Sequence, residues 1–374
     1  MRVAVAMKRK RGDAVESRNA AIIRRAKPSD LPALVELVGL SDARTYTVGA
    51  VERAVAGLDP GAYLAWLAFS GDRAVGCCML EIRTLRWGQR QLRAGHWTNL
   101  YLRPDCRGMK ICPQLTFAMF EDALAEGIDV VYGATRRRGM PALFVSLGMR
   151  TMGDLPVYAK PLRPVRLLVK RGGFGRASRA LSAVPDAVYE AGSRCWGSRA
   201  PAGLPVEQVD WNSTGVEQLF ELSCASVRER VHQVRTLGSF RRRFAGNLDG
   251  EPYLLLGARK VGRFAGGLVY RLAERLEQIR AGVIMEVFHD TSDGDAARAC
   301  LLEVERRTYI QGAEVLVCLP GCNTAAVQTL RELGYVKSPE TYTLVWKSLD
   351  RSADPCTMPN PSQFHFTFSD YDAF

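Results

Sequence analysis

The sequence predicts an α/β (α+β) protein of two tandem units, each a mixed central β-sheet flanked by helices. The chain has 374 residues, which is long enough for two domains of ordinary size. Segments that alternate apolar and polar residues like strands are interspersed with segments of helical periodicity. Their order in the first half returns in the second at a spacing of about 185 residues, which indicates a duplicated domain rather than a solenoid.

Short stretches carry this repeat. Residues 126–131 (EGIDVV) match residues 311–316 (QGAEVL), and residues 146–149 (SLGM) match residues 332–335 (ELGY). We therefore expect five consecutive parts. They are a disordered basic N-terminus (1–19), a first unit (20–162), a linker rich in Arg, Gly, Ser and Pro (163–205), a degenerate second unit (206–350) and a C-terminal tail (351–374).

The first unit is expected to contain both element types. Strands are predicted at 22–24, 63–69, 74–82, 96–102, 129–134 and 149–160, and helices at 28–38, at 48–56, from Pro113 onward and at 140–147. A tight turn at 70–73 joins the second and third strands, and residues 83–90 are predicted as a charged hairpin turn.

The second unit repeats the plan after a linker with one weak helical piece at 180–196. Helices are predicted at 216–231, 239–244, 296–310 and 324–333, and strands at 253–258, 263–270, 279–289, 314–319 and 335–347. In the tail, residues 363–372 (QFHFTFSDYD) alternate aromatic and polar side chains. We expect a short edge strand that packs an aromatic face, with a binding motif as the alternative.

Composition excludes some functional classes. Apolar residues make up 47% and charged residues 24%, as in a globular protein, and no run of about 18 apolar residues could span a membrane. The net charge of +12 indicates a surface that attracts nucleic acid, an anionic membrane or a phosphorylated ligand. The arginine clusters lack the aromatic interleaving of a nucleic-acid platform, so nucleic acid is the disfavoured partner. A cytoplasmic location is expected.

The cysteines and histidines predict neither a metal site nor disulfides. Ten cysteines occur without a CxxC pair, and the four histidines are widely scattered. Several cysteines lie within apolar strand or helix patterns, where cysteine is usually a small core residue. Reduced thiols agree with the expected cytoplasmic location.

Residues 96–127 organise the first unit. A half-buried strand (96–102) ends at Pro104, a basic turn follows at 107–110, and an amphipathic helix begins near Pro113. A helix N-terminus has backbone N–H groups without partners, so a turn that also carries Arg and Lys is suited to a phosphate group.

The pattern Leu100-x-Leu102-x-Pro104-x-x-Arg107-Gly108-x-x-Ile111 resembles the acyl-CoA-binding motif of the GCN5-related N-acetyltransferase superfamily. The resemblance implies two such folds in tandem, with acetyl-CoA or another acyl-CoA as co-substrate and no metal. It also implies a cofactor site. The expected binding residues are Leu100 and Leu102 for the pantetheine arm, and Arg107, Gly108, Met109, Lys110, Ile111 and Cys112 for the pyrophosphate.

The corresponding turn of the second unit, at 291–296, carries two carboxylates where phosphates would lie. Like charges repel, so we expect the second unit to contribute shape and substrate binding. In the first unit the candidates for the base are Glu81 and His96, although each could equally be a structural polar residue. Phe144 stands where the superfamily often has a tyrosine that donates a proton. Tyr101, Tyr158 or water is then the proton source, or the thiolate leaves without a dedicated acid.

The leading hypothesis is an acyl-CoA-dependent N-acyltransferase that acts on a small-molecule or saccharide amine. An amino sugar or nucleotide-linked sugar of surface-polysaccharide synthesis is one such acceptor. The alternative is a non-catalytic protein of the same fold that binds a carbohydrate or a protein partner. Lys110, Cys112 and Phe144 favour this alternative, whereas the intact run from Leu100 to Gly108 favours the enzyme.

Overall fold

The computed structural model describes residues 21–41, 63–171, 185–186, 188, 204–245, 251–275, 279–289, 294–321, 323–349 and 358–371. The expected disordered N-terminus and the helix predicted at 48–56 lie outside the described residues. So do most of the 163–205 linker and the start of the acidic turn at 291–296.

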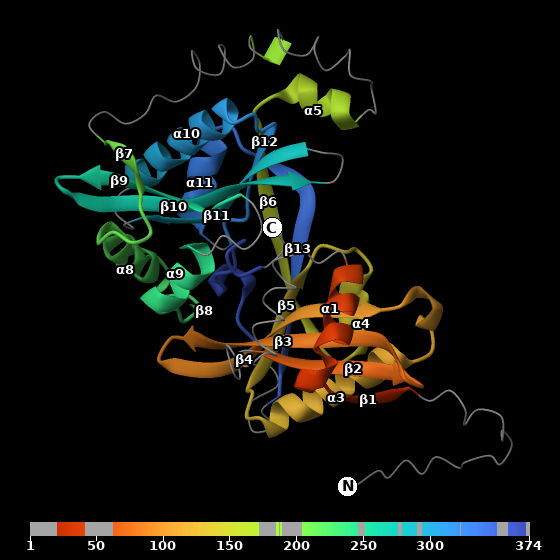
Figure 1. Ribbon diagram of the computed structural model, residues 1–374. Helices are drawn as coiled ribbons and strands as arrows, with labels where there is room; N and C mark the ends of the chain where they lie inside the picture. Colours follow the sequence, from red (N-terminus) through yellow and green to blue (C-terminus); the bar gives the residue numbers. More distant parts are fainter. Residues whose placement is uncertain are drawn as a thin grey trace, which may run out of the picture.

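Within this described part, thirteen strands form one mixed sheet that runs through both halves of the chain (Figure 1). The strands are β1 (Ile22–Arg25), β2 (Tyr63–Ser70), β3 (Arg73–Trp87), β4 (Arg90–Leu102), β5 (Val130–Thr135), β6 (Arg150–Pro161), β7 (Val206–Val209), β8 (His232–Gln233), β9 (Leu254–Lys260), β10 (Arg263–Arg275), β11 (Ile279–His289), β12 (Val315–Cys318) and β13 (Val336–Ser348). The helices are α1 (Leu31–Leu40), α3 (Ile111–Ala125), α4 (Met140–Ser146), α5 (Pro164–Arg171), α8 (Gly215–Val227), α9 (Leu237–Ala245), α10 (Gly294–Ile310) and α11 (Thr324–Glu332).

Strands β1 to β5 lie in chain order in the first half, with only β4 and β5 parallel among them. Helices α1 and α3 cover opposite faces of the sheet. Successive residues of β3 point to opposite faces, so they pack under different helices. Cys77 and Met79 pack in the core under α1, whereas Cys78 and Leu80 pack in the core under α3. The predicted mixed α/β architecture is confirmed.

The second half is built in the same way. Helix α10 packs over Leu268 and Ile284, and α8 packs over Val269 and Val283 on the other face of the sheet. Strands β11 and β12 form the parallel pair here, as β4 and β5 do in the first half. The duplication seen in the sequence is therefore also a duplication of architecture.

The two halves exchange their last strands. β13 lies between β5 and β6, and β6 pairs with β12 of the second half. Figure 1 shows β6 and β13 running side by side between the two parts of the molecule. Strand 149–160 was predicted as the closing strand of its own half, but β13 separates it from β5. Each half is thus completed by a strand of the other.

Equivalent backbone hydrogen bonds record this exchange. Asp129 precedes β5 in the first half, and Glu314 precedes β12 in the second. The backbone N–H of each donates to the neighbouring strand, and the carbonyl oxygen of each accepts from the residue that follows the strand exchanged from the other half. The four bonds are Asp129 N to Arg93 O (2.8 Å), Leu349 N to Asp129 O (2.8 Å), Glu314 N to Arg280 O (2.8 Å) and Leu162 N to Glu314 O (2.9 Å). The exchange therefore obeys the internal symmetry of the repeat.

The hairpin between β3 and β4 is longer than expected. Only Gly88 and Gln89 form its turn, and Gly88 takes the left-handed backbone conformation (φ +59°) that glycine allows. Leu85 and Leu92 are buried in a core that includes residues of both halves, and β8 pairs with the outer part of β3. The prediction of a charged turn at 83–90 is wrong, because contacts distant in sequence extend the ladder past the arginines.

The tail also differs from its prediction. Residues 358–371 contain a short 3-10 turn, η5 (Pro361–Gln363), and a single bridge between Phe364 and Val231, but no edge strand. Phe364, Phe366 and Phe368 are at most 1% exposed, and they fill a core that joins residues of both halves. The alternation of aromatic residues therefore reflects insertion between the halves and not pairing at a sheet edge.

Replacing Phe366 with Ala is expected to destabilise the protein by about 3–5 kcal/mol, because it opens a cavity in this shared core. Its ring lies 5.9 Å from that of His96, and Gly321 packs directly on its backbone. The measurement is the free energy of unfolding in urea. Phe117→Ala is the control, since Phe117 is 49% exposed on α3. Equal losses in the two variants would contradict an integral role for the tail.

Candidate functional site

The turn between β4 and α3 is open and basic. It includes the 3-10 turn η3 (Pro104–Cys106) and continues through Arg107 to Lys110, all four of these last residues being exposed. Gly108 has a φ of +89°, and a side chain built there would meet no atom within 4 Å. The backbone therefore presents a clear face to solvent at this point.

The amides at the end of this turn and at the start of α3 have no acceptor within the described part of the chain. Among the described residues, none of the five backbone N–H groups from Gly108 to Cys112 donates a hydrogen bond to another group. Lys110 precedes the helix in the left-handed conformation (φ +59°), which costs free energy for a residue with a side chain. Burial raises the pKa of the Cys112 thiol, so that group adds no negative charge. The turn has the features of an anion site.

β4 and β5 separate next to this turn. They pair only from Ala94 to His96, whereas β13 pairs with the other edge of β5 from Val130 to Thr135. At Gly133 a side chain would lie 3.3 Å from the Trp97 carbonyl oxygen, so the strands are close just before they diverge. Leu100 and Leu102 remain paired with β3 on one side only, which leaves their other edge facing the gap between β4 and β5.

The divergence coincides with an irregularity in β4. Leu80 pairs with Trp97 and Cys78 pairs with Leu100, so Thr98 and Asn99 together face a single residue of β3. A β-bulge of this kind redirects backbone groups and side chains locally. β11 has the corresponding irregularity opposite Val269 and Tyr270.

Glu81 and His96, the candidate bases, lie side by side. β3 and β4 place them directly opposite each other, and Glu81 Oε2 lies 3.8 Å from His96 Nδ1. Arg83 donates to the same carboxylate oxygen at 2.6 Å. Burial alone would raise the pKa of Glu81, but Arg83 and His96 outweigh it and hold the pKa below its usual range. Glu81 is therefore ionised at neutral pH.

The imidazole of His96 is enclosed by aromatic rings. It is 1% exposed, is stacked on Tyr132 with centroids 5.0 Å apart, and meets the edge of the tail residue Phe366. Burial raises the pKa of Tyr132 to about 12, so its hydroxyl stays protonated. The ring of His96 is thus held in one place beside a permanent negative charge.

A second buried group of polar residues lies on the second half, and we refer to it as the Arg235 cluster. It comprises Arg235, Glu286, Ser223, Ser369 and Asp370. Arg235 donates to Glu286 Oε2 at 2.5 Å and to Asp370 Oδ1 at 2.7 Å. Ser369 and Ser223 donate to the two oxygens of Glu286 at 2.9 and 3.3 Å. Arg235 is thus the shared ion-pair partner of both carboxylates in the cluster.

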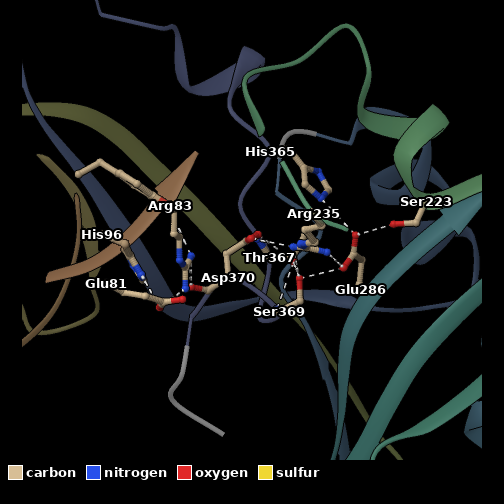
Figure 2. Close-up of polar contacts among 11 residues, drawn as sticks. Glu81, Arg83, His96, Ser223, Arg235, Glu286, His365, Thr367, Ser369 and Asp370 are labelled. Carbon is tan, nitrogen blue, oxygen red and sulfur yellow. Dashed lines mark hydrogen bonds and ion pairs between the residues drawn. The ribbon is translucent and has the colours of Figure 1, made fainter. Parts of the chain in front are cut away.

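Asp370 connects these two groups, as Figure 2 shows. Its carbonyl oxygen accepts from Arg83 at 3.0 Å, while its carboxylate accepts from Arg235 and from the Thr367 amide. A continuous polar chain therefore runs from Glu81 on β3, through the tail, to Glu286 on β11.

The structure thus brings the expected residues together in two places. Arg107 to Lys110 form a turn that leads into Ile111 and Cys112 at the start of α3, and Glu81 and His96 form a contact. Sequence reasoning missed Arg83, Arg235, Glu286 and Asp370. Glu286 left a signal, because it is a lone carboxylate within the apolar run of β11, and such a residue needs a buried partner.

Within the described ranges, no group of three or more His, Cys, Asp or Glu side chains could hold a metal ion. None of the helices described there is long and apolar enough to cross a membrane.

No protein-family model matches the sequence, and none of the curated proteins does so significantly. Solved structures do match the fold. A GCN5-related N-acetyltransferase from Kribbella flavida is 14% identical with a TM-score of 0.59, covering 91% of this chain and 73% of its own. A tandem GNAT protein from the clavulanic acid biosynthesis pathway is 13% identical with a TM-score of 0.58, covering 89% and 100%.

N-myristoyltransferase from Saccharomyces cerevisiae, solved with bound myristoyl-CoA, is 11% identical with a TM-score of 0.58, and the match covers 94% of this chain and 85% of that one. At these identities the likeness is one of fold. The chain has the tandem fold of GCN5-related N-acetyltransferases, as the resemblance in sequence implied.

Replacing Arg235 with Met is expected to destabilise the protein at pH 7 by about 3–5 kcal/mol, because it leaves Glu286 and Asp370 buried without their counter-charge. Arg306→Met is the control. Its exposed pair with Glu303 is expected to contribute about 0–1 kcal/mol. Both free energies of unfolding are measured in urea.

The cost of Arg235→Met depends on pH with a defined sign. Burial by itself would raise the pKa values of Glu286 and Asp370. The positive charge of Arg235 is the main factor that outweighs burial and holds both pKa values below normal. Stability from such groups is present above the unfolded pKa of about 4 and is lost as the pH falls below it. The difference between wild type and Arg235→Met should therefore shrink between pH 5 and pH 3. A difference that stays constant would refute the charge-based explanation.

Proposed function

We propose, from the tandem acetyltransferase fold and the open turn before α3, that this chain is an acyl-CoA-dependent N-acyltransferase. The donor is most simply acetyl-CoA, and the acceptor is the amine of a small molecule or saccharide. The likeness to N-acyltransferase structures supports the reaction class. The observation that carries the proposal is the row of unpaired amides from Gly108 to Cys112.

The turn fits the diphosphate of a coenzyme A. Five N–H groups without acceptors are available in one short segment, and the positive end of the α3 dipole adds to them. Arg107 and Lys110 flank the segment with charges of the right sign. A side chain built at Gly108 would meet no atom of the described part of the chain within 4 Å, and Lys110 is exposed, so the approach to the backbone is open.

The adjacent gap between β4 and β5 fits the extended arm of the same molecule. In our proposal Leu100 and Leu102 present their unpaired backbone edge to the pantetheine amides, as a sheet edge does to a neighbouring strand. Bound there, the acyl-CoA would supply an activated thioester. The bulge at Thr98 and Asn99 lies beside this gap, and a backbone amide there would stabilise negative charge on the thioester oxygen.

His96 and Glu81 are proposed to manage the proton. The acceptor amine forms a bond to the acyl carbon, the carbon–sulfur bond breaks, and the amine loses one proton. In our proposal His96 receives that proton and Glu81 stabilises the resulting imidazolium without becoming protonated itself. The lowered pKa of Glu81 supports this division of roles, because a carboxylate with a low pKa is a weak base and a poor proton acceptor. The imidazolium then returns its proton through water to the leaving thiolate, which gives the free thiol and regenerates neutral His96.

Wild-type protein is expected to be stabilised by millimolar acetyl-CoA, by about 2.7 kcal/mol at a concentration 100 times the dissociation constant. Arg107→Glu should lose most of this effect, because it places a negative charge beside the diphosphate. The measurement is the thermal unfolding curve with and without acetyl-CoA.

Arg90→Glu is the matched control, since Arg90 is an exposed arginine at the start of β4, the strand that leads to the turn of Arg107. It should behave as wild type does. A wild-type curve unaltered by acetyl-CoA would defeat the proposal and favour the alternative of a non-catalytic binding protein.

Glu81→Gln is expected to lower the pKa of His96 and to move the acid limb of the pH–rate profile to lower pH, because it removes the adjacent negative charge. His96→Gln should reduce kcat by about 10²- to 10⁴-fold. The pKa of His96 can also be read directly by NMR titration, which requires no acceptor.

Glutamine keeps a carbonyl oxygen for Arg83 but removes its buried counter-charge, so Glu81→Gln is expected to lose stability, and the titration is made where the variant is folded. Glu126→Gln, at an exposed ion pair with Arg25, controls for a general loss of charge. If the His96 titration is the same in wild type and Glu81→Gln, the two residues do not act as a pair.

A further inference from the structure

A pocket of about 250 Å³ lies where the two halves meet, apart from the turn before α3. Its lining comes from the outer part of β3, the end of α8, the segment that includes β8, and the tail. The residues that matter here are Arg86, Cys224, Arg228, Glu286 and His365. The proposed function leaves this pocket without a role.

The pocket carries uncompensated positive charge. Arg86 and Arg228 are exposed and have no ion-pair partner among the described residues. Arg235 also lines the pocket, but its charge is taken up by Glu286 and Asp370. Burial raises the pKa of the Cys224 thiol, and Arg235 and, more weakly, Arg86 oppose that rise. Two arginines therefore remain available to a ligand.

His365 gives the pocket a polar wall. It is 6% exposed, and neither ring nitrogen has a hydrogen-bond partner among the described residues. Glu286 Oε1 lies 3.7 Å from its Nε2. Figure 2 shows the imidazole extending from the tail toward Glu286 and Ser223. Nδ1 of this buried ring has neither a hydrogen bond nor an ion pair within the described part of the chain, and a bound molecule could supply the partner.

The size of the pocket indicates a small molecule. Pockets for drug-sized ligands measure about 300–1,000 Å³, so this one suits a compact metabolite. It also connects to the proposed chemistry, because the polar chain from Glu286 through Arg235, Asp370 and Arg83 ends at Glu81.

We propose that this pocket binds the anionic group, carboxylate or phosphate, of the amine acceptor, with Arg86 and Arg228 as its counter-charges. The identification of the ligand as the amine acceptor rests on the proposed function. The binding of a small anion in this pocket is independent of it. Two of the arginines behind the net charge of +12 would thus serve substrate recognition.

Cys224 provides a reporter inside the pocket, since its thiol is exposed and lines the cavity. Its alkylation by anionic iodoacetate and by neutral iodoacetamide is compared at low salt by mass spectrometry of its peptide. We expect the iodoacetate-to-iodoacetamide rate ratio to be at least about threefold higher in the native protein than in the unfolded chain. Inorganic phosphate, at constant ionic strength, should slow the native reaction.

The double variant R86Q/R228Q should bring the ratio near its unfolded value and abolish protection by phosphate. Arg90→Gln, on the same hairpin but outside the pocket lining, should keep the native ratio. Acetyl-CoA stabilisation of the double variant should equal that of wild type, because the turn before α3 is intact. A ratio unaffected by R86Q/R228Q, or equally affected by Arg90→Gln, would overturn the proposal.

Three amines then test the identity of the ligand. Phosphoethanolamine carries a phosphate, glutamate carries carboxylates and ethanolamine carries no anion. CoA release by one anionic amine should exceed that by ethanolamine at least tenfold, and R86Q/R228Q should raise KM for that amine with little change in kcat. Equal use of ethanolamine would overturn the acceptor assignment. No release from any amine, with the Cys224 ratio intact, would count against the transferase and leave the anion pocket standing.

Discussion

The contact on which the molecule depends is the one that Asp370 makes with two arginines. Its carbonyl oxygen receives Arg83 of the first half and its carboxylate receives Arg235 of the second. Both guanidiniums are largely buried, and a buried charge without a partner costs several kcal/mol. The tail must therefore occupy its place for either half to be stable. Its phenylalanines then fill the remaining space with apolar surface.

Such a junction determines more than stability. Buried ion pairs often add little net free energy compared with apolar packing, but they are satisfied only in one geometry. Glu81 and Glu286 stand at the two ends of the chain of polar contacts, so the position of one half relative to the other is defined at both. The proposed base and the proposed anion pocket are consequently held in a fixed relation, which a reaction between two bound substrates requires.

Local sequence patterns predicted much of this architecture. The alternation of β2 and β3, the helical periodicity of α10 and the glycine after α4 are set by neighbouring residues, as is the turn at 107–110. The hairpin arginines and the tail were misread because their environment comes from distant segments. Arg83 resembles a solvated charge in sequence, yet residue 370 buries it. The exchange of β6 and β13 leaves no local trace, since either strand would fit beside β5 or β12.

The exchanged strands also impose an order on folding during synthesis. β5 lacks its neighbour until β13 has emerged from the ribosome, some two hundred residues later in the chain. Until then the first half exposes an unpaired edge and the apolar surface beneath it, which are the features that invite aggregation. Contacts so distant in sequence form slowly. We therefore expect the nascent chain to depend on chaperones, and the midpoint of the gene to be a poor place to divide it.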